Sequence, residues 1–511
     1  MSGRQASTVG RHLCSRWGVL FALVAAAGVV LRVWAYRSLS GTPNADEAVI
    51  GLMARHVLDG ELSTFYWGQA YGGSQEALLT APLFLVAGSS WLAVRLVPIA
   101  LSAVAALLVW RVGRRTIGEP AAAVAGGVLW IWPPFDLYML THQQGFYASN
   151  IVYCALLLLL ALRAAEQPDA VRVGTLGFVL GLAFWQTAQI VPVAVGVIAW
   201  VVWRQPRALR HLPVAVPLAV LGALPWILWN AGHGWESLAQ EDYGDKLHSL
   251  RLLASPFLPM MVGLRAPFSA ELLVPAPLTY VAYVALVALF IVGAVKTRKR
   301  DSSILYVVAA IFPFVYAFSP STSVELGSPR YLVVLAPVLA LLAAQVATSF
   351  RRALAVLVLA FVISVVTTHR MDEWFGGTPR PTTYAEGLGP RHIVQSVPRD
   401  LGPLIATLDR LGLDRVFAEY WVAYRLTFDT DERIVATENA FRRLTFEDGQ
   451  ANPTFGQPGR RPEYDREVRR ARHGFVFYRE TVDTVPIVPE LERRGYRRFD
   501  VGSLVVYAPP R

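Results

Sequence analysis

Long apolar runs alternate with short polar connections over the first three quarters of the chain, up to about residue 368. A run of roughly 20 apolar residues is long enough to cross a bilayer as a helix, and shorter runs can be extended by flanking residues or be interrupted helices. The pattern predicts about eleven spans, at residues 17–34, 90–110, 120–139, 151–162, 173–186, 190–203, 212–229, 278–295, 304–318, 331–347 and 353–367. The run 77–86 is too short to span, and we expect it to lie along the outer interface.

The pattern changes after residue 368, where charges become frequent and apolar segments shrink to strand length. Residues 400–411 have helical periodicity, and short apolar segments at 416–418, 433–436 and 474–478 are typical of strands. Helices that alternate with strands in this way predict a small α/β domain. The predicted fold is therefore a polytopic α-helical membrane domain, residues 1–368, followed by a soluble α/β domain, residues 369–511.

Composition and charge agree with this division and add an orientation. Of the 511 residues, 54% are hydrophobic and only 16% are charged, against about 25% charged in soluble domains. Arg and Lys gather in alternate connections, and such loops stay on the cytoplasmic side of a membrane. We therefore expect a multi-pass protein of the plasma membrane with a cytoplasmic N-terminus and an extracytoplasmic C-terminal domain. The net charge of +10 is partly this signal, so no nucleic-acid partner is implied.

The first outer loop, residues 37–89, contains a cluster of polar and ionisable side chains between two apolar runs. It contains the adjacent carboxylates Asp46 and Glu47, followed by the segment Tyr-Trp-Gly-Gln-Ala-Tyr-Gly-Gly-Ser-Gln-Glu at residues 66–76. Ionisable groups beside a bilayer are costly, so a cluster of them is a candidate functional site.

These residues carry a resemblance to a known family. The segment 46–56, the segment 66–77, Gly88, Arg-Leu-Val-Pro at 95–98 and Pro-Arg-Tyr-Leu at 329–332 resemble bacterial GT-C glycosyltransferases of the protein-mannosyltransferase-like group. That group includes the dolichyl-phosphate-mannose protein mannosyltransferases and the aminoarabinose transferase of lipid A. The resemblance covers the membrane domain, and its first outer loop is the specific part.

The resemblance implies that a sugar moves from a polyprenyl-phosphate donor in the membrane to a glycan, lipid or protein acceptor of the cell envelope, with inversion at the anomeric carbon. Asp46 matches the family's acidic position, and a carboxylate can take the proton of an attacking hydroxyl. Glu47 would position the acceptor or a metal. Arg330 and Arg55 are the predicted cations for the departing phosphate, because a guanidinium binds two oxygens at once. The other predicted substrate contacts in the outer loops are Tyr66, Trp67, Gln69, Tyr71, Glu76 and Tyr331.

One departure from the group limits what can be carried over. Where the aminoarabinose transferase has an Arg-Tyr pair, this chain has Val49 and Ile50, and its Lys-Pro-Pro segment is replaced by residues 74–76. Glu76 cannot bind a phosphate directly unless a metal or a proton intervenes, so donor recognition must differ and a lipid A acceptor is not implied.

Each candidate also has a structural interpretation. Asp46, Glu47 and Glu76 could cap helices. Arg95 is expected to reach toward lipid headgroups, and the three loop aromatics could be interfacial anchors. His142 is expected to form hydrogen bonds within its loop. No metal-ligand spacing appears around it, so no metal site is assigned and the cofactor stays open. A divalent cation held by Asp242 and His248 is one candidate.

Two functions of other classes compete with a transferase. A transporter or lipid flippase would place ionisable residues near the middle of the bilayer, whereas the span interiors here are almost free of charge. A non-catalytic scaffold that binds envelope glycan with its outer domain is the other alternative.

Overall fold

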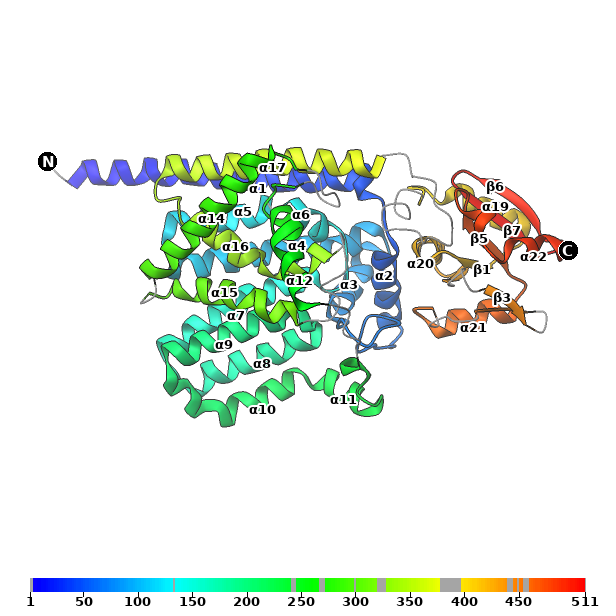
Figure 1. Ribbon diagram of the computed structural model, residues 1–511, viewed down its shortest axis with the longest axis horizontal. Helices are drawn as coiled ribbons and strands as arrows, with labels where there is room; N and C mark the ends of the chain where they lie inside the picture. Colours follow the sequence, from blue (N-terminus) through cyan, green and yellow to red (C-terminus); the bar gives the residue numbers. More distant parts are fainter. Residues whose placement is uncertain are drawn as a thin grey trace.

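A helical bundle and a smaller domain built on a β-sheet make up the chain (Figure 1). The computed structural model describes residues 3–131, 134–239, 245–265, 272–297, 300–318, 328–376, 397–438, 444–447, 450–453 and 459–510. The predicted boundary at residues 368 and 369 lies inside a helix, α17, which continues to Gly376. The smaller domain is described from residue 397.

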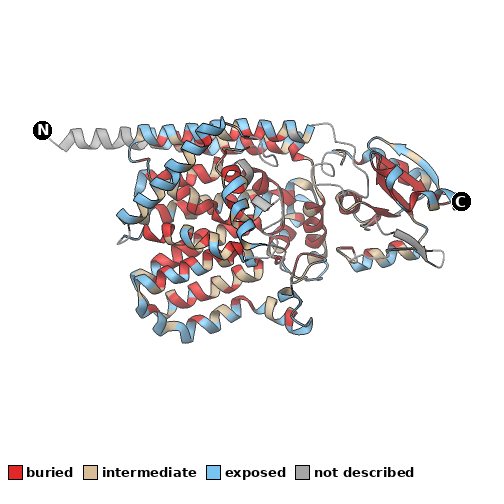
Figure 2. Ribbon diagram, in the orientation of Figure 1, coloured by how far each residue is buried: buried red, intermediate tan, exposed pale blue. Residues whose placement is uncertain are grey.

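The bundle is formed by helices of very different length. They are α1 (Gly3–Arg37), α2 (Ala45–Leu58), α3 (Gln75–Ala87), α4 (Trp91–Thr116), α5 (Glu119–Ile131), α6 (Pro134–Thr141), α7 (Tyr147–Glu166), α8 (Ala170–Gln186), α9 (Val191–Arg204), α10 (Leu212–Gly222), α11 (Leu224–Gly232), α12 (Lys246–Leu252), α13 (Leu258–Met261), α14 (Ala276–Thr297), α15 (Ser303–Ala317), α16 (Ala336–Ala344) and α17 (Phe350–Gly376). The outward faces of these helices are exposed and their inward faces are buried, as Figure 2 shows.

Five helices of the described part are long and apolar enough to cross a membrane, or six if a bent pair is counted as one span. The five lie in α1, α4, α7, α14 and α17, and the bent pair joins residues 188–204 to residues 206–222 at an angle of 112°. The helices α3, α5, α8, α15 and the segment 330–344 are apolar but shorter. The structure thus has the several apolar helices of a polytopic membrane protein, and the count of about eleven spans stays a prediction.

The smaller domain contains a five-stranded mixed sheet with the strand order β2-β1-β5-β7-β6. Strand β1 pairs in parallel with β2 and β5, whereas β7 pairs in antiparallel with β5 and β6. A two-residue turn at Gly502 and Ser503 joins β6 to β7, and Gly502 has a φ of +60°, which glycine adopts without a steric penalty. The elements are α19 (Gly402–Leu411), β1 (Arg415–Ala418), α20 (Tyr420–Asp429), β2 (Val435–Glu438), β3 (Leu444–Glu447), β4 (Gln450–Pro453), α21 (Pro462–Arg470), β5 (Gly474–Tyr478), α22 (Val488–Arg493), β6 (Arg497–Val501) and β7 (Leu504–Ala508).

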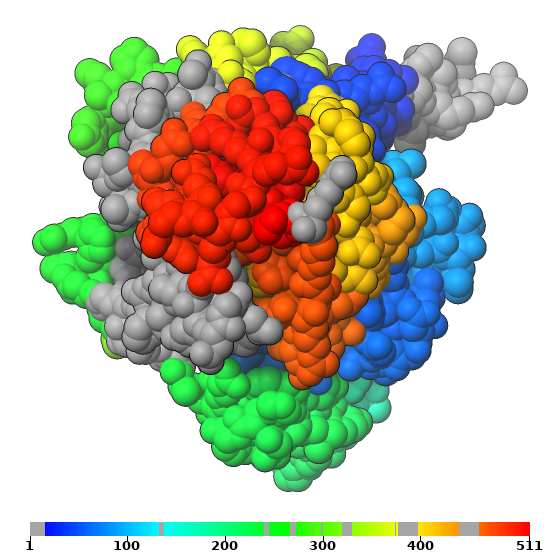
Figure 3. Space-filling model, turned by 90° about the vertical axis from the view of Figure 1, so that its right-hand side faces the viewer, coloured from blue at the N-terminus to red at the C-terminus, as the bar shows by residue number. Residues whose placement is uncertain are grey.

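The first loop packs on the smaller domain. Apolar residues of α2, α3 and the start of α4 form one continuous buried cluster with the core of the sheet domain. A Cβ added to Gly51 of α2 would lie 2.4 Å from the ring of Phe428 in α20, so the two helices touch at a glycine. Viewed from the right-hand side of Figure 1, the sheet domain covers the end of the bundle that carries α2 (Figure 3).

The two ends of the chain lie at opposite ends of the molecule (Figure 1). Arg399 donates to the carbonyl of Arg37, so α1 ends beside the sheet domain and its N-terminus points away from it. Trp91, at the start of α4, donates to Asp429 of the sheet domain, so the basic end of α4 also lies far from it.

Candidate functional site

A capping box fixes the start of α2 and with it the two adjacent carboxylates. The Asn44 side chain accepts a hydrogen bond from the backbone of Glu47 at 3.0 Å, and the Glu47 carboxylate accepts one from the backbone of Asn44 at 3.1 Å. This reciprocal pair satisfies two amides that the first turn of a helix leaves free. Asp46 is the second residue of the helix and remains partly exposed.

Two phenols meet the Asp46 carboxylate. The Tyr66 hydroxyl lies 3.2 Å from Asp46 Oδ1, and the Tyr420 hydroxyl, from α20 of the sheet domain, donates to the same oxygen. Burial raises the pKa of both phenols well above their ordinary value, so both stay protonated as donors. Among the described residues, none donates to Oδ2. Among these residues, the carboxylate is thus held through Oδ1 alone.

A guanidinium from the sheet domain covers these phenols. The Cζ atom of Arg460 lies 5.3 Å from the ring centroid of Tyr66 and 5.2 Å from that of Tyr420. Its Nη1 donates to Oε1 of Gln69 at 2.9 Å. Contacts of this kind are favourable cation–π interactions. Arg460 is also within electrostatic range of Asp46.

A second arginine approaches Asp46 from the bundle. Arg330 lies in a short 3₁₀ helix (Ser328–Leu335) before α16, and its Nη2 donates to the hydroxyl of Tyr331 at 3.0 Å. Electrostatic interactions connect Arg330 with Asp46 and with Tyr147 of α7. The exposed Tyr71 interacts with both Arg330 and Arg460. The structure therefore gathers Asp46, Tyr66, Gln69, Tyr71, Arg330 and Tyr331, six of the predicted residues, around one site.

Glu47 points away from this site into a buried ion pair. Arg95 donates to both of its oxygens at 2.7 Å, and the backbone of Gln143 donates at 3.0 Å. His142 Nδ1 lies 3.2 Å from the carboxylate. Burial alone would raise the pKa of Glu47, but Arg95 and His142 hold it well below its usual range. These partners occupy the carboxylate, so the predicted contact of Glu47 with an acceptor or metal is not retained. Arg95 does not reach toward lipid headgroups either, because only 1% of it is exposed.

Glu76 is likewise fully buried. Its Oε1 accepts hydrogen bonds from the backbone of Ser149 at 2.9 Å and from the Ser149 hydroxyl at 2.7 Å. Ser149 lies in the first turn of α7, where a carboxylate complements the free amides of the helix. The hydrogen bonds of Glu76 therefore connect α3 to α7, and this placement does not support a contact with the sugar donor.

Arg55 and Trp67 attach the sheet domain to the first loop. Arg55 Nη2 donates to the carbonyl of Phe428 at 2.9 Å and pairs with Asp431 at 2.7 Å. It lies nine residues beyond Asp46, about 13 Å along the helix, so the predicted phosphate contact is not retained. Trp67 is buried, and the Arg461 guanidinium lies 4.5 Å from its ring centroid. It is therefore unavailable to a sugar or to the membrane surface.

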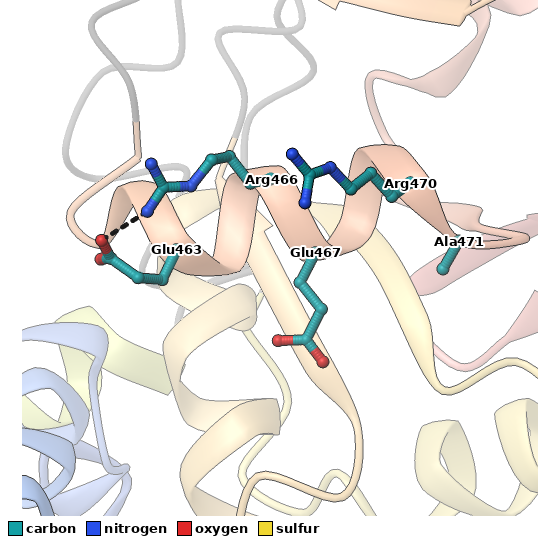
Figure 4. A pocket seen from close by; sticks show the side chains of 5 residues that line it. All are labelled: Glu463, Arg466, Glu467, Arg470 and Ala471. Carbon is teal, nitrogen blue, oxygen red and sulfur yellow. Dashed lines mark hydrogen bonds and ion pairs between the residues drawn. The ribbon is translucent and has the colours of Figure 1, made fainter.

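Two cavities, each of about 400 Å³, lie away from Asp46. One is a surface depression along α21, lined by Glu463, Arg466, Glu467, Arg470 and Ala471 (Figure 4). The other lies between the C-terminal end of α1, the start of α4 and the start of α19. In the ranges that the structure describes, no group of three His, Cys, Asp or Glu side chains could hold a metal ion. Asp242 lies outside those ranges, so the divalent cation stays a prediction.

Sequence reasoning missed the contribution of the sheet domain. Tyr420 is 374 residues and Arg460 is 391 residues from the loop residues that they contact. Tyr420 begins α20, a segment to which the sequence alone assigned no functional role. Arg460 was indistinguishable from the other arginines of a basic domain.

Comparison with known proteins agrees with this architecture. A family model described as dolichyl-phosphate-mannose-protein mannosyltransferase matches residues 77–229. None of the curated proteins matches significantly. The crystal structure of ArnT from Cupriavidus metallidurans bound to undecaprenyl phosphate has a TM-score of 0.59 at 14% identity, and the match covers 97% of this chain and 100% of that one. Its apo form has a TM-score of 0.61 at 14% identity, with 98% and 100% covered.

These matches show what the chain is similar to. At 14% identity the likeness to ArnT shows a common fold along nearly the whole chain. The family model covers less than half of the chain but includes α3 to α11. The predicted resemblance to the protein-mannosyltransferase-like group agrees with the family model over residues 77–229 and with the fold shared with ArnT.

Proposed function

We propose that the protein is a membrane glycosyltransferase that moves a sugar from a polyprenyl-phosphate donor to a hydroxyl of a cell-envelope acceptor. The observation that carries the proposal is the Asp46 carboxylate, whose Oδ1 is held by two phenols while no described residue donates to Oδ2. Arg330 and Arg460 both interact with it electrostatically. The fold, shared with a protein crystallised with undecaprenyl phosphate, supports a lipid-phosphate donor.

In the proposed reaction Asp46 acts as the general base. The acceptor oxygen attacks the anomeric carbon of the sugar while its proton moves to the Asp46 carboxylate. The bond from the anomeric carbon to the phosphate oxygen breaks, and its electron pair leaves with the polyprenyl phosphate. Attack from the face opposite the leaving group inverts the anomeric configuration. Arg330 stabilises the charge that develops on the leaving phosphate.

The two ends of the bundle support an orientation for this chemistry. The basic residues Arg111, Arg114 and Arg115 lie in the last turns of α4, away from the sheet domain. The tendency of basic loops to stay inside would place that end, together with the N-terminus, in the cytoplasm. Asp46 and the sheet domain would then lie on the extracytoplasmic side of the plasma membrane, where the acceptor is found.

Release of polyprenyl phosphate tests the proposal directly. Purified protein is incubated with a panel of polyprenyl-phosphate sugars and a cell-envelope extract, and polyprenyl phosphate is quantified. We expect release from at least one donor, reduced about 10²- to 10⁴-fold in Asp46→Asn, because general-base catalysis is usually worth that factor. The asparagine variant keeps the shape of the side chain, and its melting temperature is the control for folding.

Three other results of these experiments would each lead to a different conclusion. Absence of release above the Asp46→Asn level with every donor would contradict the proposed reaction. Equal rates for wild type and Asp46→Asn, with release present, would leave a transferase but remove Asp46 as its base. Lipid or sugar transport into vesicles that survives Asp46→Ala would favour a transporter.

A further inference from the structure

The C-terminal sheet domain holds Arg460 in place over the first loop. Its guanidinium lies over the rings of Tyr66 and Tyr420 and donates to Gln69, so two domains fix one side chain. The backbone of Arg460 is fixed as well, because its N–H donates to Oε1 of Glu438, the last residue of β2, at 3.2 Å. An arginine held at both ends loses little further freedom when it binds a ligand.

Two glycines permit this approach. Gly68 of the first loop has a φ of +69°, and a Cβ added to it would lie 2.5 Å from the Cα of Arg460. A Cβ added to Gly459 would lie 2.6 Å from Thr437 Oγ1. Real Cβ atoms do not come this close, so the chain at Gly459 and Arg460 is wedged between the loop and β2. Gly68 therefore sets the position of Arg460 above the loop.

Among the described residues, the guanidinium of Arg460 has no carboxylate as an ion-pair partner. Other arginines at the domain junction have carboxylate partners: Arg95 pairs with Glu47, Arg55 with Asp431 and Arg461 with Glu61. Within the described part of the chain, no carboxylate lies within ion-pair distance of Arg460. Asp46 and Glu438 interact electrostatically with its guanidinium without forming an ion pair with it. A largely enclosed cation of this kind is well suited to an anionic ligand.

Arg460 and Arg330 approach the same space from different domains. Asp46 interacts electrostatically with both arginines, and so does Tyr71. In the reaction proposed above, the negative charge that arrives at this space is the phosphate of the donor. Phosphate oxygens accept paired hydrogen bonds from guanidinium groups, and two cations would share the charge of the leaving group.

We propose that Arg460 is a phosphate-binding residue of the donor site, supplied by the C-terminal domain and acting together with Arg330. This inference rests on the proposed function. It means that the membrane domain alone forms an incomplete donor site, and that the sheet domain must be docked on the first loop for the lipid phosphate to bind fully.

Binding of a polyprenyl phosphate and of the uncharged polyprenol of equal length, each to the purified full-length protein in detergent, separates the two proposals. Wild type is expected to prefer the phosphate. A charge-assisted hydrogen bond is typically lost at a cost of about tenfold to a hundredfold in affinity, so Arg460→Gln should bind the phosphate that much more weakly and the polyprenol equally well. Arg466→Gln, an exposed arginine on α21 of the same domain, is the matched control and should bind both as wild type does.

Two more variants keep the test decisive if Arg460→Gln does not fold. Arg460→Lys retains the charge without the two-pronged geometry and should fall between wild type and glutamine. Gly68→Ala leaves Arg460 in the chain but displaces it, and it should weaken phosphate binding without affecting polyprenol. Unchanged phosphate binding in folded Arg460 variants would overturn the role of Arg460 and leave the donor class intact. A wild-type protein that does not distinguish phosphate from alcohol would contradict the proposed function itself.

Discussion

Two neighbouring carboxylates in the first turn of α2 have opposite environments. Successive residues of a helix point about 100° apart, so Asp46 faces the phenols of the site while Glu47 enters the interior and meets Arg95. The sequence could show that an acidic pair begins the loop, and the resemblance pointed to Asp46. It could not show that Glu47 has a buried partner 48 residues away, because only the folded loop brings α4 beside α2.

Removing the charge of Glu47 should destabilise the protein rather than change its chemistry. Glu47→Gln leaves Arg95 buried without a counter-charge, and breaking a buried pair in this way costs about 3–5 kcal/mol. We expect a clearly lower melting temperature in detergent, measured by intrinsic fluorescence. Asp46→Asn is the matched control, an equivalent change at the next residue, and should melt close to wild type. A Glu47→Gln protein that is as stable as wild type but inactive would instead assign Glu47 to catalysis.

At the scale of elements, small residues decide how the apolar helices pack. Cβ atoms added to Gly177 and Gly181 of α8 would lie 2.3 Å and 2.0 Å from carbonyl oxygens of α10. Close contact of this kind is a common way for helices to associate in a membrane, where apolar burial alone gives little preference. The apolar runs predicted both helices, but periodicity did not show that α10 ends at Gly222, with α11 following as a separate helix.

A larger residue at this contact should separate the two helices. Gly181→Val places side-chain atoms where the carbonyl of Ala219 now lies, and overpacking costs about 1–3 kcal/mol even where the neighbours are flexible side chains. We expect a lower melting temperature and a lower yield of folded protein. Gly18→Val, also within a helix but with no atom near the added Cβ, should cost much less. Equal losses in the two variants would show that the β-branched residue itself, not the helix contact, is responsible.

For the whole molecule, the important feature is that the first loop and the sheet domain share one core. The end of the apolar runs gave the predicted division of the chain. Helix α19 and strands β1, β2 and β5 overlap the segments expected there, whereas β3, β4 and α21 were not predicted. The contacts of that domain with α2 could not be predicted, because they join residues several hundred positions apart through ordinary side chains. As a result, the surroundings of Asp46 include groups from the sheet domain, Tyr420 and Arg460.

The docking contacts include a histidine that should make them depend on pH. His56, near the end of α2, lies between Glu61 at 2.8 Å and Glu432 of the sheet domain at 3.1 Å, with Arg461 and Tyr464 packed nearby. The hydrogen bond that His56 donates to the Glu432 carboxylate raises the pKa of His56 above its ordinary value, although burial and Arg461 act in the opposite direction. The docked state therefore favours the protonated ring.

The sign of the effect follows from this raised pKa. The contribution of His56 to docking is fully present below the pKa of the undocked ring, about 6.5, and is lost as the pH rises through the higher pKa of the docked state. Hydrogen exchange of α20, corrected for the intrinsic effect of pH, should show weaker protection at pH 9 than at pH 6. His56→Gln keeps hydrogen-bonding groups without a titrating charge, and its protection should change less over the same range. Identical profiles for the two proteins would exclude His56 as the origin. Helix α20 carries Tyr420, and Arg460 belongs to the same domain. Loss of protection at high pH should therefore be accompanied by loss of polyprenyl-phosphate binding. A domain that contributes no group to the binding site would undock without any change in binding.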